Sequence, residues 1–129
     1  MPLPPPGIKI LVVDDQTMMR AITKDILNSL GYVNIAEAEN GSMALEKLRT
    51  DKFDLVMLDW NMPVMQGIDV LKAMREDPKL KDIPVIMVTA EAEKTKVVEA
   101  LKSGVTNYIV KPFKPSALRE KFEQVFSKK

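Results

Sequence analysis

The sequence predicts an α/β fold in which helices cover both faces of a five-stranded parallel sheet. Short apolar runs alternate along the chain with segments whose apolar residues recur at helical spacing. Strands that alternate with helices in this way form parallel sheets covered on both sides. A chain of 129 residues is long enough for one such domain with a substantial core.

The strands are predicted from apolar, β-branched runs. The first, third and fourth runs are apolar throughout, as central strands covered on both faces should be. The second carries Glu37 and Glu39 and therefore suits an edge of the sheet. This pattern fits the strand order 2-1-3-4-5 of a flavodoxin-like doubly wound sandwich with three layers. The predicted strands are residues 8–13, 34–38, 55–58, 85–88 and 108–110.

The helices are predicted from apolar spacing and from residues that begin or end helices. Gly31 and Gly104 follow the first and fourth helices, where glycine suits a left-handed terminal residue. Pro78 lies beyond the third helix, and Pro115 suits the first position of the fifth. The fourth helix is marked by Val97, Val98 and Leu101. The residues expected to face the core in the other helices are Met19, Ile22, Ile26 and Leu30, then Ala44, Leu45 and Leu48, then Ile68, Leu71 and Met74, then Leu118, Phe122, Val125 and Phe126.

Composition excludes several classes of protein. The chain has no Cys and no His, which rules out disulfides, thiolate or histidine metal sites, His-based hydrolases and phosphohistidine donors. The net charge is +1 and the basic residues are scattered, so no basic stripe indicates nucleic-acid or membrane binding. The sequence shows no signal-peptide pattern and no apolar run of membrane-spanning length. We therefore expect a cytoplasmic monomer without membrane insertion.

The N-terminus differs in composition from the rest of the chain. Four prolines within residues 1–7 should keep this segment extended, as a short polyproline-like tail. Either the tail has a role of its own or it is a disordered end. A single domain is expected over residues 8–129, without a further output domain, so a signal would leave through a partner that binds its surface.

Polar residues end four of the five predicted strands. Asp14 and Asp15 follow the first strand, Asp59 the third, Thr89 the fourth and Lys111 the fifth. Each alone has a simple structural explanation, such as a helix cap, a turn or a solvated charge. In a doubly wound sheet, however, the carboxyl ends of the strands open on one edge, where ligands bind. Their convergence there favours a shared site.

Three carboxylates held close together repel one another unless a cation binds or one stays protonated. Without His or Cys, an all-oxygen site points to a hard divalent ion. Mg²⁺ fits best because it retains several waters, whereas Ca²⁺ normally recruits more protein oxygens. A metal beside a carboxylate, a lysine and a hydroxyl is suited to phosphoryl transfer. In this interpretation Asp59 becomes an acyl phosphate, whose oxygens Lys111 and Thr89 contact.

Several segments resemble the CheY-like receiver domains of two-component signalling. The resemblance runs from about residue 8 to residue 126, and all its motifs occur in order at the ends of predicted strands. An Asp-Asp pair alone would be weak evidence, whereas the whole set is specific. The matching segments are Val-Val-Asp-Asp at 12–15, Asp-Trp-Asn-Met-Pro at 59–63, Gly67, Val-Thr-Ala-Glu at 88–91, and Tyr-Ile-Val-Lys-Pro-Phe at 108–113.

The resemblance implies a role for each site residue. Asp59 would accept the phosphoryl group, which Thr89 and Lys111 would bind. The Lys111–Pro112 bond resembles the cis peptide with which the family aims its lysine into the site. The domain would catalyse only its own phosphorylation and dephosphorylation, as a signalling domain and not as an enzyme with an outside substrate.

The same resemblance implies a metal site. Asp15 would bind Mg²⁺ directly, and Asp14 would act partly through a metal-bound water. Asp59 and the backbone carbonyl of Asn61 would complete the protein ligands. Trp60, next to the acceptor, either packs over the rim of the site or senses a ligand.

Two segments, at 59–63 and 89–91, look particularly like chemotaxis regulators that consist of a receiver domain alone. This likeness implies a chemotaxis-type histidine kinase upstream, the flagellar motor switch or another output protein downstream, and a phosphatase as a further partner. Gln16, Thr17 and Met18 depart from the enterobacterial chemotaxis pattern, which bears on the partners more than on the chemistry.

In the family, helix four, strand five and helix five form the output face. Here that face would carry Lys94, Val97, Leu101, Tyr108 and Lys121, with Thr89 and Tyr108 as the switch. The apolar residues of helix four either form a wide core stripe or leave Val97 and Leu101 exposed.

Two functions stay open at this point: a binding switch, and a phosphotransfer intermediate that passes the group from Asp59 to a histidine of a second protein. An aspartyl-phosphate phosphatase is disfavoured because such enzymes need an acid where this chain has Asn61. A flavin carrier is disfavoured because Asp14 and Asp15 would repel the flavin phosphate.

Overall fold

The computed structural model describes residues 5–62, 65–89 and 94–126, with residues 94–97 described in their backbone only. Five parallel strands form one sheet in the order β2-β1-β3-β4-β5. The strands are β1 (Ile10–Val13), β2 (Ile35–Ala38), β3 (Leu55–Asp59), β4 (Val85–Thr89) and β5 (Asn107–Val110). The helices are α1 (Thr17–Ser29), α2 (Gly41–Thr50), α3 (Gly67–Glu76), α4 (Lys94–Lys102) and α5 (Pro115–Phe126).

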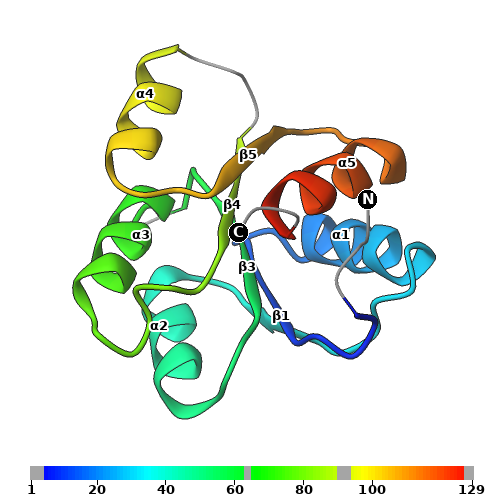
Figure 1. Ribbon diagram of the computed structural model, residues 1–129, viewed down its shortest axis with the longest axis horizontal. Helices are drawn as coiled ribbons and strands as arrows, with labels where there is room; N and C mark the ends of the chain where they lie inside the picture. The colour runs from blue at the N-terminus through cyan, green and yellow to red at the C-terminus, as the bar shows by residue number, and fades with distance from the viewer. Residues whose placement is uncertain (1–4, 63–64, 90–93, 127–129) are drawn as a thin grey trace.

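The sheet is the middle of three layers, as predicted. Helices α1 and α5 lie on one face, and α2, α3 and α4 lie on the other (Figure 1). Every residue of β1, β3 and β4 is buried, whereas β2 at the edge is only partly buried over most of its length. The predicted strand order and the assignment of β2 to an edge are confirmed.

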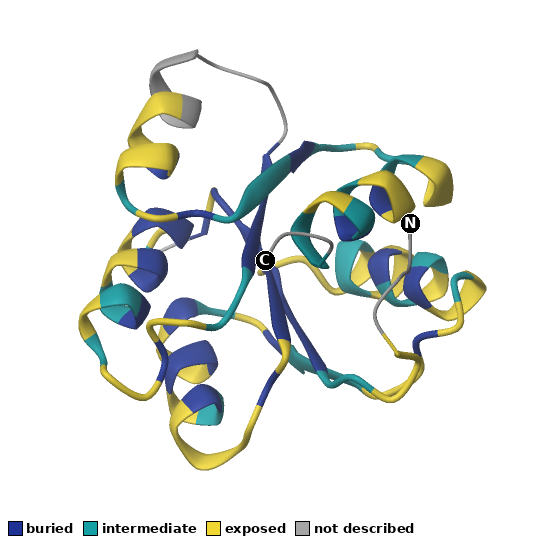
Figure 2. Ribbon diagram, viewed as in Figure 1, coloured by how far each residue is buried: buried dark blue, intermediate teal, exposed yellow. Residues whose placement is uncertain are grey.

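Successive side chains of each central strand point to opposite faces of the sheet and pack into two separate cores. Leu11 and Val13 of β1 belong to the core beneath α2 and α3, whereas Ile10 and Val12 belong to the core beneath α1 and α5. The inner surfaces of the helices are buried and their outer surfaces are exposed (Figure 2). This two-sided burial explains why the central strands had to be apolar at every position.

The predicted core faces are confirmed for α2 and α3, and in α5 Leu118 and Phe122 are completely buried. The prediction for α1 is wrong in part. The buried residues there are Thr23 and Leu27, while Ile22 is 43% exposed. A search for apolar spacing does not count Thr23 because threonine is polar. The predicted buried face of α1 is therefore turned by about one residue from the observed one.

The residues predicted to begin or end helices have the expected conformations and positions. Gly31 and Gly104 have φ values of 98° and 93°, in the left-handed region, and Pro115 is the first residue of α5. The prediction of an extended tail is wrong for the described residues of this segment. The backbone N–H of Ile8 donates a hydrogen bond of 3.2 Å to the carbonyl of Pro5 and so closes a turn. Residues 1–4 lie outside the described part. Within that part, no helix is long and apolar enough to cross a membrane.

Candidate functional site

The polar residues at the strand ends meet at the carboxyl edge of the sheet. Each of Asp14, Asp15 and Asp59 offers a carboxylate oxygen, and these oxygens lie within 4.8 Å of one another. No other such group of three acidic residues is found in the part of the chain that the structure describes. They border an open cavity of about 540 Å³, lined by Asp15, Gln16, Met19, Asp59, Asn61, Lys111 and Pro112.

Asp59 is the last residue of β3 and is only 3% exposed. Its carboxylate lies 3.0 Å from the amine of Lys111. Burial raises the pKa of Asp59 to about 6, and the charges of Asp14 and Asp15 add to this rise, against the opposing effect of Lys111. The pocket therefore raises the free energy of the ionised Asp59 carboxylate, and additional positive charge would lower it.

Asp14 is buried, and both its backbone and its carboxylate make hydrogen bonds. Its N–H donates to the carbonyl of Ala38 in the neighbouring strand at 3.1 Å, and its Oδ1 accepts from the N–H of Gln16 at 2.9 Å. Its backbone carbonyl accepts from Arg20 at 2.7 Å, and its Oδ2 lies 3.4 Å from the amine of Lys111. By contrast, the carboxylate of Asp15 is exposed at the mouth of the cavity.

Lys111 follows β5 and reaches across to the acidic residues. The Lys111–Pro112 peptide is cis, as the resemblance to receiver domains implies, and the N–H of Lys111 donates to the carbonyl of Thr89 at 2.8 Å. Burial lowers the pKa of the Lys111 amine, but its contacts with Asp59 and Asp14 outweigh that effect, so the pKa is raised overall. Lys111 is therefore a permanent cation inside an anionic crevice.

The remaining predicted site residues surround this crevice. Thr89 ends β4 and is buried, and Asn61 is exposed and lines the cavity. Trp60 is 4% exposed and belongs to the core beneath α2 and α3. Of the two explanations for Trp60, the structure favours packing.

Two residues that support the site had no structural role in the sequence-based prediction. Gly67 lies so close to Asp59 that a Cβ there would collide with the Asp59 carbonyl oxygen. Arg20, one turn into α1, binds the backbone of Asp14. An arginine one helical turn after an acidic pair is the signal that could have identified Arg20, but patterns based on strand ends do not register it.

The other predicted output residues belong to α4, β5 and α5. Val98 and Leu101 of α4 are 48% and 57% exposed, so the alternative of a wide core stripe is wrong for these two residues. Tyr108 is partly buried, and the amine of Lys121 lies 5.1 Å from the centre of its ring. The side chains of Lys94 and Val97 lie outside the described residues.

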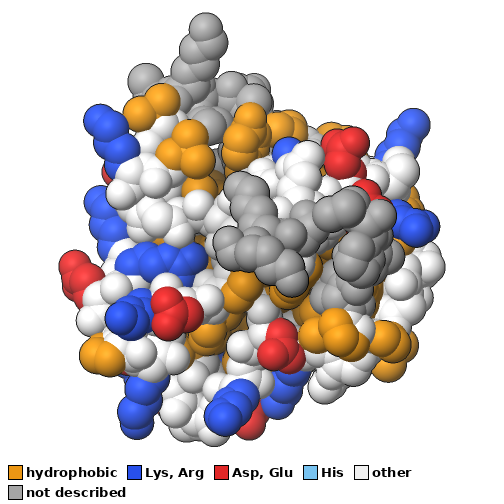
Figure 3. All heavy atoms as spheres, viewed as in Figure 1, with side chains coloured by type: hydrophobic (Ala, Val, Ile, Leu, Met, Phe, Trp, Pro, Cys, Tyr) orange, Lys and Arg blue, Asp and Glu red, His pale blue; other side chains and the backbone are white. Residues whose placement is uncertain are grey.

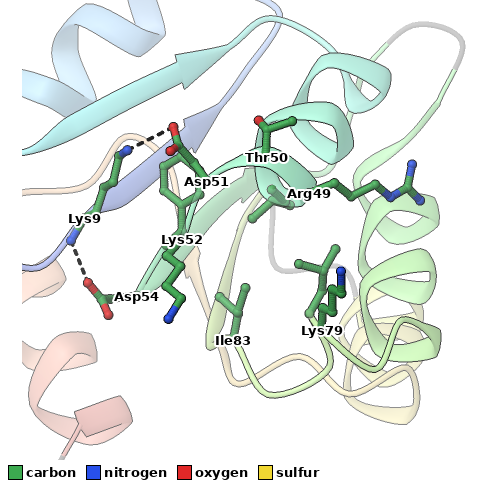
Figure 4. A pocket seen from close by; sticks show the side chains of 11 residues that line it. Lys9, Arg49, Thr50, Asp51, Lys52, Asp54, Lys79 and Ile83 are labelled. Carbon is green, nitrogen blue, oxygen red and sulfur yellow. Dashed lines mark hydrogen bonds and ion pairs between the residues drawn. The ribbon is translucent and has the colours of Figure 1, made fainter.

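A second, larger cavity of about 840 Å³ lies at the opposite edge of the sheet, where the strands begin. Figure 4 shows Lys9 between Asp51 and Asp54 and joined to both. The Lys9 amine lies 3.1 Å from Asp51, and the Lys9 N–H donates to Asp54 at 2.8 Å. On the face shown in Figure 3, basic and acidic side chains are likewise interspersed. Such paired surface charges indicate no particular chemistry.

Comparison with known proteins places these observations in a family. The family model for the response regulator receiver domain matches residues 10–123. Over 121 residues the chain is 50% identical to the chemotaxis protein CheY of Pseudomonas aeruginosa, and the match covers 94% of this chain and 98% of that protein.

Solved structures agree with this placement. The chemotaxis protein CheY4 of Vibrio cholerae superposes with a TM-score of 0.85 at 35% identity, covering 92% of this chain and 98% of that one. The receiver domain of the Pseudomonas aeruginosa sensor histidine kinase PA1611 also has a TM-score of 0.85, at 25% identity, covering 95% of this chain and 99% of that one. In that structure a magnesium ion is coordinated in the active-site cleft.

Proposed function

Because the chain belongs to the response regulator receiver domain family, we propose that it is a binding switch controlled by phosphorylation of Asp59. The observation that carries this proposal is the crevice itself. Three carboxylates lie within 4.8 Å of one another, and the amine of Lys111 contacts two of them, Asp59 at 3.0 Å and Asp14 at 3.4 Å. We place the whole activity in one receiver domain over residues 8–129, working as a monomer in the cytoplasm.

Mg²⁺ is the metal that these donors fit. All three side chains offer hard oxygen ligands, and two of them are buried with a single ammonium group as counter-charge. Asp14, Asp15 and Asp59 would hold the ion together with the Asn61 carbonyl, and its charge would favour the ionised form of Asp59 and neutralise phosphoryl oxygens. We expect weak binding in the absence of phosphate, because few protein oxygens replace the waters of the ion.

Asp59 would act as the nucleophile. Burial raises the pKa of Asp59 to about 6, which is still below 7, so the ionised carboxylate predominates at neutral pH. A carboxylate oxygen forms a bond to phosphorus while the bond from phosphorus to the donor breaks, and the electron pair leaves with the donor. Lys111 contributes a fixed positive charge to the transferred group, and Thr89 a hydroxyl at the end of the adjacent strand.

The output would leave through α4, β5 and α5. Phosphorylation adds roughly one to two negative charges at a fixed point, toward which Thr89 can donate its hydroxyl. Movement of Thr89 would vacate space that Tyr108 can fill, and partner affinity would follow the population of inward Tyr108. The exposed side chains of Val98 and Leu101 on α4 suit such a partner surface. The partners we propose are a chemotaxis-type histidine kinase and the flagellar motor switch.

The chemistry is tested by incubation with acetyl phosphate and Mg²⁺, followed by intact mass measurement. We expect the addition of one phosphoryl group in the wild type and none in Asp59→Asn. Asp25→Asn is the matched control, since Asp25 is an exposed aspartate of α1. Equal phosphorylation of Asp59→Asn and the wild type would refute Asp59 as the acceptor.

The output is tested with purified flagellar switch protein and beryllofluoride, which mimics the acyl phosphate. Binding should strengthen on activation in the wild type, and this gain should shrink in Thr89→Ala and change in Tyr108→Trp. A full gain in both variants would refute the proposed switch. Transfer of the phosphoryl group from Asp59 to a histidine protein, without activation-dependent binding to the switch protein, would favour the phosphotransfer intermediate.

A further inference from the structure

The guanidinium group of Arg20 donates hydrogen bonds to two separate acceptors, which distinguishes it from an ordinary surface arginine. From α1, its Nη1 donates to the backbone carbonyl of Asp14 at 2.7 Å, and its Nε donates to Glu37 of β2 at 2.9 Å. Only 11% of its side chain is exposed. Glu37 also forms an exposed ion pair with Lys24, at 3.0 Å, on a different carboxylate oxygen from the one that accepts from Arg20.

The carbonyl that Arg20 binds belongs to the peptide between the two acidic residues Asp14 and Asp15. A peptide unit is planar, so fixing its oxygen fixes the direction in which the chain continues to the next Cα. The N–H of Asp14 is already tied to Ala38 of β2 at 3.1 Å. With both ends of Asp14 fixed to β2, directly and through Glu37 and Arg20, the Cα of Asp15 is held in place, and the Asp15 carboxylate starts from a fixed point beside the crevice.

We infer that Arg20 is a positioning residue for the metal site: it holds the Asp14–Asp15 peptide so that both carboxylates face Asp59. This inference rests on the proposed function. Arg20 acts through the backbone and contacts neither the phosphoryl group nor the metal. Glu37 on the edge strand is the anchor of this arrangement, which gives the otherwise peripheral β2 a part in the chemistry of the site.

Charge and geometry make opposite forecasts for the loss of Arg20. Removing a cation near three carboxylates should strengthen Mg²⁺ binding if only electrostatics mattered. Removing a group that orients metal ligands typically weakens metal affinity by about tenfold or more. The direction of the change therefore separates the two explanations, and a merely structural role would produce neither.

The test measures the Mg²⁺ dissociation constant by calorimetry, with circular dichroism as the check on folding. We expect Arg20→Ala to bind Mg²⁺ about tenfold more weakly than the wild type. Lys24→Ala is the matched control: it removes the other ion pair of Glu37 and leaves the Asp14 carbonyl bound, so its affinity should equal that of the wild type.

Arg20→Lys keeps the charge but cannot donate from two nitrogens of a rigid fork to two acceptors. It should keep the melting temperature of the wild type and still bind Mg²⁺ more weakly. It also decides the matter if Arg20→Ala does not fold. Unchanged or tighter Mg²⁺ binding in a folded Arg20 variant would overturn the positioning role. A wild type that binds no Mg²⁺ would instead overturn the proposed metal site.

Discussion

The two edges of the sheet differ in chemistry more than in shape. The cavity at the amino edge, at about 840 Å³, is larger than the cavity of about 540 Å³ at the carboxyl edge. At the amino edge, however, Lys9 contacts both neighbouring aspartates, Asp51 and Asp54. Asp51 is more than half exposed, with 59% of its side chain accessible, so water screens its charge.

At the carboxyl edge, three carboxylates lie together, and the ammonium group of Lys111 contacts two of them, Asp14 and Asp59, so negative charge is in excess when all three are ionised. Asp14 and Asp59 are buried, so water screens little of this imbalance. The comparison teaches that cavity volume is a poor guide to function in this fold. An unbalanced, buried charge at the carboxyl ends of the strands is the better guide.

The largest expected difference between the edges lies in their lysines. Lys111→Met should destabilise the protein by about 3 kcal/mol in the absence of Mg²⁺, because it leaves buried carboxylates without a counter-charge. Added Mg²⁺ should restore part of that loss. Lys9→Met removes a solvent-accessible ion pair with Asp51 and the contact of the Lys9 amine with the Phe53 ring, and should cost only about 1 kcal/mol. Urea unfolding with and without Mg²⁺ measures both, and equal costs would abolish the contrast.

The second difference is in pH dependence. The pKa of Asp59 is raised from 3.8 to about 6, so between these values the folded protein binds more protons than the unfolded chain. Its stability should therefore fall as pH rises from about 4 to about 6, by about 2–3 kcal/mol from this group. The fall should be absent in Asp59→Asn, in urea titrations run without divalent ions. A wild-type profile that matches that of Asp59→Asn over this range would contradict the raised pKa of Asp59 as the cause of the fall.

A smaller difference concerns two glycines. A Cβ at Gly67 would collide with the backbone of Asp59 and Trp60, whereas Gly7, near the amino edge, has no heavy atom within 4 Å of that position. Gly67→Ala should therefore cost about 2 kcal/mol, and Gly7→Ala should be close to neutral. Thermal unfolding measures both, and a neutral Gly67→Ala would show that the loop after Asp59 can move freely.

The smallest expected signal comes from Trp60. It is the single tryptophan of the chain, so its fluorescence is assigned without ambiguity. Because Trp60 is buried next to Asp59, we expect Mg²⁺ to change its emission by a modest fraction. An emission that does not change, while calorimetry shows Mg²⁺ binding, would show that the core beneath Trp60 does not respond to the metal.

Much of this molecule follows from its sequence. The division into central and edge strands was predictable because uninterrupted apolar runs are typical of central strands and Glu37 marks an edge, and the full order followed from the flavodoxin-like topology that this pattern fits. The acidic crevice was predictable because polar residues end the strands on a single edge. These features depend on periodicity and topology, which the spacing of residue types along the sequence shows directly.

What the sequence did not predict depends on packing between distant segments. The core face of α1 was misplaced because Thr23 is buried despite its hydroxyl. The role of Arg20 depends on a hydrogen bond from α1 to the carbonyl of Asp14, and the position of Arg20 one turn into the helix suggests that bond without establishing it. The exposure of Leu101 depends on how α4 sits over the sheet, and the same apolar pattern was compatible with burial.

The central claim is that the carboxyl edge is the functional one and that it communicates with the surface around Tyr108. The most direct test is an amide ¹H–¹⁵N spectrum recorded before and after addition of Mg²⁺ and beryllofluoride. We expect the amides of Asp14, Asp59, Thr89 and Lys111 to shift, with further shifts at Tyr108 and Leu101, while residues 51–54 at the amino edge stay unchanged. Shifts confined to residues 51–54, or an unchanged spectrum, would contradict the claim.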